Sequence, residues 1–190
     1  MIFRAHRPLL LLAVALLAAT ALAGCGNKME TRTVGETEGL YVDVAELKYQ
    51  VQISRILNPN DVEDQSYLQG LPAGTVPPES NEAWFGVWIR VQNTTSDQRL
   101  PVAEEFEIVD TQENSFEPIE LEDNALAYTP RELAPETVLP NSESPAGQGV
   151  IQGSLILFKL TTEALQNRPL EFKIQSPETP DDVGIIDLDV

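Results

Sequence analysis

The sequence predicts an all-β domain built as an antiparallel β-sandwich. Several short segments alternate apolar and polar residues with a period of two, as half-buried strands do. Turn-forming residues separate these segments at intervals of about eight to twelve residues. No segment keeps a helical period over several turns. Together these observations favour two packed sheets over a helical or mixed fold.

Ahead of the domain, residues 1–24 have the composition of a secretory signal peptide. Arg4 and Arg7 supply positive charge, and an apolar run follows from Leu9 to Leu22. The run is too short and too rich in alanine to cross a bilayer, which takes about 20 predominantly apolar residues. We therefore predict that residues 1–24 are removed on export.

The only cysteine in the chain, Cys25, follows this run directly. The tetrapeptide Leu22-Ala23-Gly24-Cys25 resembles the lipobox of bacterial lipoproteins. The resemblance implies that the sulfur of Cys25 carries a diacylglyceryl group, that the chain is cut before it, and that the new amino terminus is acylated. Two or three acyl chains hold a protein durably at a membrane, whereas one chain binds only marginally. A free thiol is the alternative, but it would be open to oxidation outside the cell.

Residues 25–39 are polar, rich in Thr and Glu, and without apolar periodicity. This composition predicts a flexible tether that leads to one folded domain over residues 40–190. The 166 residues left after cleavage (190 − 24) are enough for a single domain that buries about 70% of its unfolded surface.

The first two predicted strands are "ELKYQVQISRIL", residues 46–57, and "AWFGVWIRVQN", residues 83–93. In the second strand, alternation places Phe85, Val87, Ile89 and Val91 on one face and Trp84, Gly86, Trp88 and Arg90 on the other. Further strands are predicted at 105–110, around 150–160, at 170–175 and at 185–190. Only residues 161–165 and the region 121–126 look briefly helical.

The segment "VIQGSLILFKL", residues 150–160, is apolar on both faces and therefore predicts a central strand. No disulfide is available to join the sheets, so large aromatic side chains must fill the space between them. The candidates are Trp84, Phe85, Trp88, Phe106, Phe158 and Phe172.

Four short motifs carry a resemblance to a known family. They are Val91-Gln92-Asn93, the turn from Asp110 to Asn114, Pro145-Ala146-Gly147, and Phe158-Lys159-Leu160. With this spacing the chain is similar to the bacterial extracellular immunoglobulin-like domains found on lipoproteins. Asn114 stands where that family often has glycine, and asparagine also tolerates positive φ. The resemblance implies an immunoglobulin-like β-sandwich at the cell envelope, in a family whose members mostly have no assigned activity.

Between the first two strands lies a connection, residues 58–82, that is longer than structure alone requires. Its first part gathers oxygen-bearing side chains of the kind that calcium prefers. These weak metal candidates are Asn58, Asn60, Asp61, Glu63 and Asp64. The spacing differs from that of an EF-hand, so a solvated acidic loop is the default expectation. Tyr67 and Leu68 either anchor this loop to the sandwich or form a recognition tip, and we include Trp84 and Trp88 with them as candidates for partner contact.

Composition excludes several kinds of catalysis in the mature chain. The only histidine, His6, lies in the leader, and the only cysteine is assigned to lipid. Histidine- or cysteine-based nucleophilic catalysis and zinc or copper sites therefore lack their residues. Paired carboxylates remain available, although adjacent acids on a strand, such as Glu104 and Glu105, would point to opposite faces.

The net charge of the mature chain disfavours some classes of binding partner. The leader holds two of the twelve basic residues and no acidic one, so the mature chain carries a formal charge of −20 (10 − 30). Nucleic acids and anionic lipid headgroups are disfavoured as partners, because each phosphate contact needs a cation. Two interpretations of the acidic charge remain: a cationic partner, or, more simply, an acidic surface that only contacts solvent.

The sequence thus predicts a lipid-anchored, extracytoplasmic binding module of the bacterial cell envelope, without catalysis and without a cofactor other than the lipid on Cys25. It is held at the cell membrane and engages an unidentified envelope protein or ligand. Two alternatives stay open: a calcium-dependent adhesion module that uses residues 58–64, and a carboxylate-based hydrolase of envelope glycans. The second of these requires a cleft with two facing acids.

Overall fold

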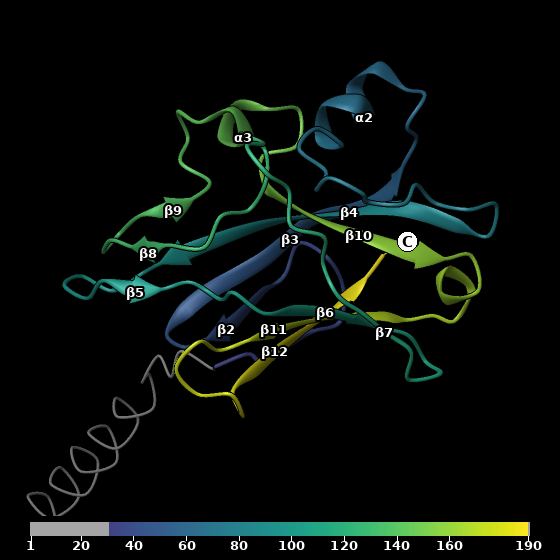
Figure 1. Cartoon of the computed structure of the whole chain (residues 1–190). Helices are drawn as coiled ribbons and strands as arrows, with labels where there is room; N and C mark the ends of the chain where they lie inside the picture. The colour runs from purple at the N-terminus through teal and green to yellow at the C-terminus, as the bar shows by residue number, and fades with distance from the viewer. Residues whose placement is uncertain (1–30, 190) are drawn as a thin grey trace, which may run out of the picture. The chain divides into compact units, whose positions relative to one another are not determined.

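The structure, a computed structural model, describes residues 31–189 and consists of two β-sheets packed face to face (Figure 1). The predicted signal peptide and Cys25 lie outside the described residues. Sheet A contains, in spatial order, β1 (Val34–Gly35), β12 (Val183–Leu188), β11 (Leu170–Gln175), β6 (Phe106–Val109) and β7 (Ser115–Phe116). Sheet B contains β10 (Ser154–Thr161), β4 (Glu82–Asn93), β3 (Leu47–Leu57) and β2 (Tyr41–Val44), with β9 (Val138–Leu139) also paired to β4.

The remaining elements are short. Strands β5 (Leu100–Pro101) and β8 (Glu132–Leu133) pair with each other. The helical turns are α2 (Val62–Tyr67), α3 (Pro145–Gln148) and the 3₁₀ turn η2 (Ala164–Gln166). In Figure 1, α2 and α3 lie above sheet B, and sheet A forms the lower layer. The predicted all-β sandwich is confirmed, and β3, β4, β6, β10, β11 and β12 lie where the alternating segments place them.

The core between the sheets follows the predicted alternation. Phe85, Val87, Ile89 and Val91 of β4 are all buried in it. The rings of Phe106 and Phe172 stack at 5.6 Å between centroids, and Phe158 meets Phe172 edge-on at 6.2 Å. Four of the six aromatic residues expected between the sheets are therefore there, whereas Trp84 and Trp88 belong to a second cluster.

Strand β10 is not the central strand that its apolar faces predicted, because it ends the order of sheet B. Its free edge is protected by hydrogen bonds to the chain at 119–128: the Ile119 N–H donates to Leu157 O at 2.7 Å, and the Tyr128 N–H donates to Leu155 O at 2.8 Å. Its outer face is covered as well, since Leu155 and Leu157 are buried in the second cluster. A third layer, rather than a central position, explains the apolar pattern.

The expected tether extends less far than residue 39. Strand β1 pairs in parallel with β12 at Val34 and Gly35. Just before it, the Asp43 N–H of β2 donates to Arg32 O at 2.6 Å, and the Ile185 N–H of β12 donates to Thr33 O at 2.8 Å. The segment from residue 32 onward therefore bonds to both sheets and belongs to the folded domain. Its polar composition misled the prediction, because a two-residue strand leaves almost no periodic signal.

Two local predictions also differ from the structure. Residues 121–126 form turns, not a helix, because Asn124 Oδ1 accepts from the Leu126 N–H at 2.8 Å and Asp123 has a positive φ of 54°. In the turn after β6, the residue with positive φ is Glu113, at 64°, and not Asn114. The Asn114 side chain instead donates to the Asp110 carboxylate at 2.9 Å.

Candidate functional site

The outer face of sheet B is covered by two connections, residues 58–81 and 118–128, which we call the outer layer. Beneath it lies the second apolar cluster, whose buried members are Leu57, Tyr67, Trp84, Trp88, Leu155 and Leu157, with Leu68 packed against them. Trp84 is 4% exposed and Trp88 1% exposed. The four candidates for partner contact, Tyr67, Leu68, Trp84 and Trp88, therefore pack in this cluster and do not form a recognition surface. Tyr67 and Leu68 anchor the loop, which was the other reading of their position.

The two connections of the outer layer are bonded to each other. The Glu122 N–H donates to Gly70 O at 2.6 Å, and Asn124 Nδ2 donates to Gln69 O at 2.9 Å. Gly70 has a φ of +79°, and a Cβ there would lie 1.9 Å from Glu122 O. Only glycine fits this approach, because any other residue would meet backbone atoms that cannot move aside.

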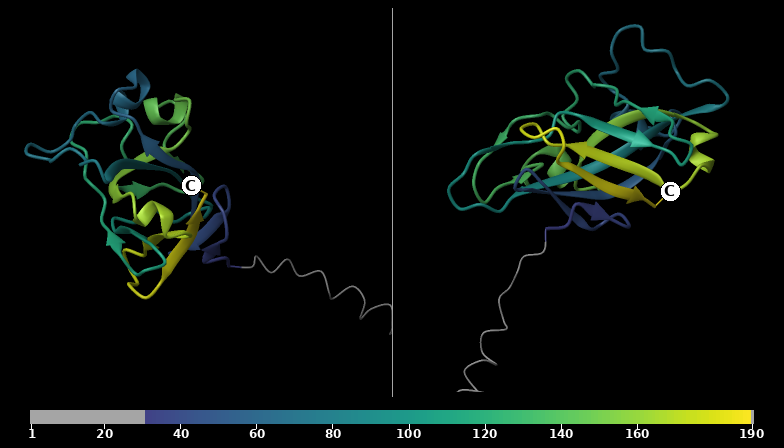
Figure 2. Two further views of the ribbon diagram at one scale, coloured as in Figure 1. Left: turned by 90° about the vertical axis from the view of Figure 1, so that its right-hand side faces the viewer. Right: turned by 90° about the horizontal axis from the view of Figure 1, so that it is seen from below.

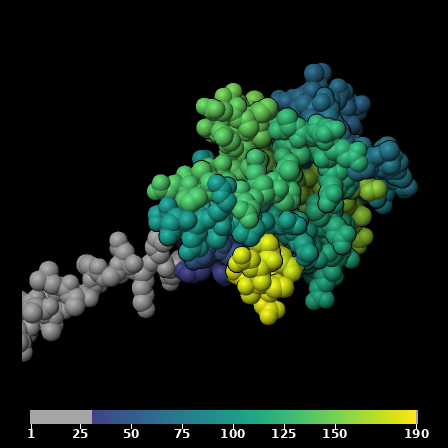
Figure 3. All heavy atoms as spheres, turned by 60° about the vertical axis from the view of Figure 1, so that its left-hand side comes forward, coloured from purple at the N-terminus to yellow at the C-terminus, as the bar shows by residue number. Residues whose placement is uncertain are grey.

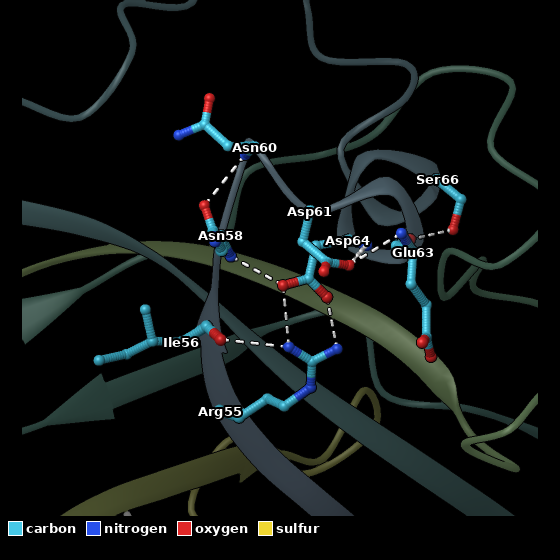
Figure 4. Close-up of polar contacts among 8 residues, drawn as sticks. All are labelled: Arg55, Ile56, Asn58, Asn60, Asp61, Glu63, Asp64 and Ser66. Atoms are coloured by element: carbon cyan, nitrogen blue, oxygen red, sulfur yellow. Dashed lines mark hydrogen bonds and ion pairs between the residues drawn. The ribbon is translucent and has the colours of Figure 1, made fainter.

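Arg55 fastens the outer layer to the sheet. The Arg55 side chain extends from β3, and its guanidinium pairs with both carboxylate oxygens of Asp64 in α2, with N–O distances of 3.0 and 2.5 Å (Figure 4). It also lies over the rings of Trp88, at 5.3 Å, and Tyr67, at 5.9 Å. The hydrogen bonds from Arg55 hold the pKa of Asp64 below its usual range, against the effect of burial. A planar forked cation suits this double task of stacking and bidentate pairing.

Three of the five residues proposed as weak calcium ligands, Asn58, Asp61 and Asp64, use their side chains in local structural bonds. Asp61 caps α2 by accepting from the backbone N–H groups of Glu63 and Asp64. Asn58 Oδ1 accepts from the Asn60 N–H at 3.0 Å. Asp64 is paired with Arg55 and also accepts from the Asn58 N–H at 2.8 Å. Within residues 31–189, no three acidic, histidine or cysteine side chains gather in a way that could hold a metal ion.

A hollow lies next to residues 102–105, a segment that two tyrosines hold in place. The Ala103 N–H donates to Tyr49 Oη at 2.7 Å, and Tyr128 Oη donates to Ala103 O at 2.8 Å. Burial raises the pKa of both phenols, so each stays protonated. The Tyr128 ring also meets Phe106 edge-on at 5.1 Å. This clamp fixes the irregular residues 102–105 immediately before β6.

Beside the clamp lies a hollow of about 580 Å³, which we call the acidic hollow. It is lined by Glu104, Glu105, Phe106, Glu107, Glu117, Pro118, Glu120, Lys173, Gln175 and Val183. These residues come from the segment 104–107, the segment 117–120 and the outer faces of β11 and β12. Glu104 and Glu105 line the same hollow because they precede the strand, so the alternation that would separate them does not apply.

A smaller hollow of about 260 Å³ adjoins it and shares Glu104, Phe106, Pro118 and Glu120 as lining residues. It continues over Ile119, Leu121, Tyr128 and Leu155. The two hollows thus combine carboxylates with aromatic and aliphatic surface. Such a combination suits a ligand that carries both positive charge and apolar groups.

The glutamates of the acidic hollow differ from the paired acids elsewhere. Asp43, for example, accepts from Lys48 Nζ at 2.6 Å, and Glu82 pairs with Lys159 at 3.3 Å. In the described chain, four glutamate side chains of the hollow form neither an ion pair nor a hydrogen bond: Glu104, Glu105, Glu117 and Glu120. Lys173, the one basic residue among the lining residues, lies 3.9 Å from Glu171. The hollow therefore presents negative charge that the surrounding residues leave largely uncompensated.

Comparisons with known proteins identify the architecture and no activity. No family model and no curated protein matches the chain. The yjhA protein from Bacillus subtilis is similar with a TM-score of 0.50 at 7% identity, over 81% of this chain and 99% of that one. An uncharacterized β-sandwich protein from Clostridium difficile 630 gives 0.44 at 10% identity, over 86% and 100%. At such identity the likeness to yjhA shows the fold alone.

A third similar structure is a candidate lipoprotein, ycdA, from Bacillus subtilis. Its TM-score is 0.44 at 9% identity, over 83% of this chain and 39% of that one. Among residues 31–189, no helix has the length and apolar character needed to span a bilayer.

Sequence reasoning missed the acidic hollow. The signal was present in "AEEFE", residues 103–107 at the start of β6, and in "EPIE", residues 117–120 directly after β7, where glutamates lie next to apolar residues. Periodicity alone does not bring these two stretches together. Their contact depends on the segment 117–120 leaving sheet A for the edge of β10, where Ile119 bonds to Leu157.

Proposed function

We propose that the protein is a non-enzymatic binding module, anchored by lipid on Cys25 at the extracytoplasmic side of the cell membrane, and that the acidic hollow is its binding site. The observation that carries the proposal is the set of uncompensated glutamates beside an apolar surface. The expected ligand is a basic segment of an envelope protein, with at least one apolar or aromatic side chain for the smaller hollow.

The proposed anchor limits how far the domain stands from the membrane. Five residues, 26–30, lie between Cys25 and residue 31, where the described chain begins. The six steps from Cys25 to residue 31, at about 3.3–3.6 Å each, reach at most about 22 Å, however the residues are arranged. The partner is therefore expected at the membrane surface and not deep in the envelope.

The binding proposal is tested with a lysine-rich peptide that carries one tryptophan, titrated against the intact protein at low and at moderate salt. Replacing two lining residues, in the variant Glu104→Gln/Glu120→Gln, is expected to weaken binding about tenfold, equal to about 1.4 kcal/mol. Added salt is expected to reduce that difference, because the charges are exposed.

The matched control is Glu63→Gln/Glu136→Gln, which removes the same charge outside the hollow. Equal losses in the two double variants would mean that net charge attracts the peptide and that the hollow is not a site. The anchor is tested separately: Cys25→Ser is expected to move the protein from the membrane fraction to the soluble fraction. An unchanged distribution would overturn the lipid assignment alone.

One observation also favours a second candidate, the carboxylate-based hydrolase of envelope glycans. That hypothesis requires a cleft with two facing acids, and the acidic hollow holds glutamates from two segments. It predicts turnover of a glycan by the intact protein that is abolished in Glu104→Gln/Glu120→Gln and retained in the control. Peptide binding without glycan turnover would favour the binding module.

A further inference from the structure

A second hollow lies where β4 changes its neighbour. Along one edge of β4, the pairing with β10 ends at Ile89, which lies opposite Ser154 of β10. The pairing with β9 begins at Val91, which lies opposite Leu139 of β9. Arg90 lies between these two pairings. A hollow of about 380 Å³ opens there, lined by Arg90, Thr137, Val138, Pro140, Asn141, Ser142, Gly147 and Gln152. We call it the Arg90 hollow.

The charge of the Arg90 hollow is opposite to that of the rest of the chain. The protein has thirty acidic residues, yet the lining contains none of them, and Arg90 is its one charged member. The nearby Glu136 and Glu143 are exposed and do not line the hollow. On the neighbouring strand, the residue in register with Arg90 is the neutral Gln50.

Arg90 also lacks the partner that half-buried cations elsewhere have. Lys48, Arg55, Lys159 and Lys173 each pair with a carboxylate. Arg90 is half-buried, and in the part of the chain that the structure describes its guanidinium forms no ion pair or hydrogen bond. Arg32, Arg99 and Arg131 lack ion pairs too, but they are exposed to solvent.

The neutral side chains of the Arg90 hollow supply further donors. Asn141 Oδ1 accepts from the Glu143 N–H at 2.9 Å, so the Asn141 amide nitrogen is the end left to donate. Neither Ser142 nor Gln152 uses its side chain in a hydrogen bond within residues 31–189. A guanidinium with neighbouring amide and hydroxyl donors is the arrangement that recognises a carboxylate.

We propose that the Arg90 hollow binds a carboxylate, with Arg90 forming a forked ion pair and Asn141 donating a further hydrogen bond. The carboxylate belongs either to a small molecule or to the free carboxyl end of a partner chain, and both sources offer the same group. The site differs from the acidic hollow in its residues and in the sign of its charge, so the proposal stands without the proposed function.

The test follows the side-chain Nε–H resonance of Arg90 by NMR in the intact protein. The probes are sodium acetate, sodium chloride, a tetrapeptide with a free carboxyl end, and the same tetrapeptide as its amide, each titrated separately and compared at equal ionic strength. A saturable shift with acetate and the acid peptide, absent with the amide and with chloride, is expected. Tighter binding of the acid peptide than of acetate would identify a chain end as the source, and equal binding would identify a small molecule.

Variants separate recognition from general charge. Binding of the acid peptide, measured by calorimetry, is expected to fall at least tenfold in Arg90→Gln, and to fall also in Asn141→Asp, which places a negative charge in the hollow. Arg131→Gln, which removes an exposed arginine elsewhere, is the matched control and is expected to bind as the parent does. The proposal is overturned if the folded Arg90→Gln variant, with an unchanged melting temperature, binds as well as the parent, or if chloride produces the same shift as acetate.

Discussion

The outer faces of the two sheets differ in whether other parts of the chain cover them. On sheet B, the outer layer covers Trp84 and Trp88 and makes the face part of a second core. On sheet A, the outward residues of β11 are Glu171, Lys173 and Gln175, and no apolar cluster forms over them in residues 31–189. In the view from below, β11 and β12 of sheet A lie toward the viewer (Figure 2). In Figure 3, the chain around α2 (blue) and the carboxyl-terminal residues (yellow) lie on opposite sides of the domain.

The two faces differ in what their side chains do: those of sheet B stabilise the fold, and those of sheet A remain at the surface. The covered face depends on aromatic packing around one ion pair, whereas the uncovered face leaves its polar residues free to line the acidic hollow. Burial on one side thus provides stability, and exposure on the other side leaves surface for a ligand. The predictions below test this division.

The largest expected effect is that of Trp88→Ala. Removing a 1% exposed indole leaves a cavity and takes away the ring on which Arg55 stacks, so the free energy of unfolding is expected to fall by about 3–5 kcal/mol. Urea denaturation measures the change. Ile185→Ala, which shortens an outward residue of β12, is the comparison and is expected to cost about 1 kcal/mol or less. Similar losses in both variants would refute the contrast between the faces.

The next effect concerns Asp110, which secures the end of sheet A by polar bonds. Although burial opposes the charge, donation from Asn114, Asn167 and the Gln112 N–H lowers the pKa of Asp110 to about 2. Asp110→Asn is expected to lower the free energy of unfolding by about 2 kcal/mol at pH 7. Because the folded pKa is lowered, this stabilisation is present above the unfolded value of about 4 and disappears as the pH falls toward 2. Denaturation across that range measures it, and a difference that stays constant would contradict the assignment.

A smaller effect is expected for Asp64→Asn in the outer layer. The change removes the charge that Arg55 meets and costs about 1–2 kcal/mol, less than a fully buried pair because the Arg55 side chain is 32% exposed. The lowered pKa of Asp64 again makes the contribution present at neutral pH and lost in acid. A double-mutant cycle with Arg55→Gln isolates the pair, and a coupling energy near zero would show that Arg55 acts only through its stacking.

The smallest effect on stability is expected in the acidic hollow. Glu104→Gln/Glu120→Gln removes exposed, unpaired charges from a strongly acidic protein, so the free energy of unfolding should change by less than about 0.5 kcal/mol and in the stabilising direction. The same denaturation experiment measures it. A large loss would mean that these glutamates support the fold and are not free for a ligand.

The sequence predicted most of the sandwich because its main strands carry a strong period of two. The predicted start of β3 lies within one residue of the observed start, and the two faces of β4 were divided correctly. The sequence did not say which of these two faces enters the core between the sheets, because it placed Phe85, Trp84 and Trp88 there together. The third layer could have been read from the same strands, since Trp84 and Trp88 on the second face of β4 and the apolar second face of β10 both require cover. The prediction placed the two tryptophans between the sheets, with partner contact as the other possibility, and made β10 a central strand, because alternation does not say what covers a face.

The candidate sites could be predicted far less well. The acidic hollow depends on a clamp between Tyr49, Tyr128 and Ala103, residues that are distant in sequence. The Arg90 hollow depends on the change from β10 to β9 along one edge of β4. Irregular segments and two-residue strands create both features, and neither has a periodic signal. Local composition did single out residues 58–64, and of these Asp61 caps α2 and Asp64 attaches it to β3.

The double attachment of the amino-terminal segment has a mechanical consequence if the proposed lipid on Cys25 holds the protein at a membrane. Arg32 bonds to β2 and Thr33 to β12, so tension from such an anchor would be divided between both sheets. Those few bonds would yield before the long ladder between β3 and β4, which joins eleven-residue and twelve-residue strands. Each residue so released would add about 3.4 Å of slack, and the domain could follow a moving partner without unfolding its core.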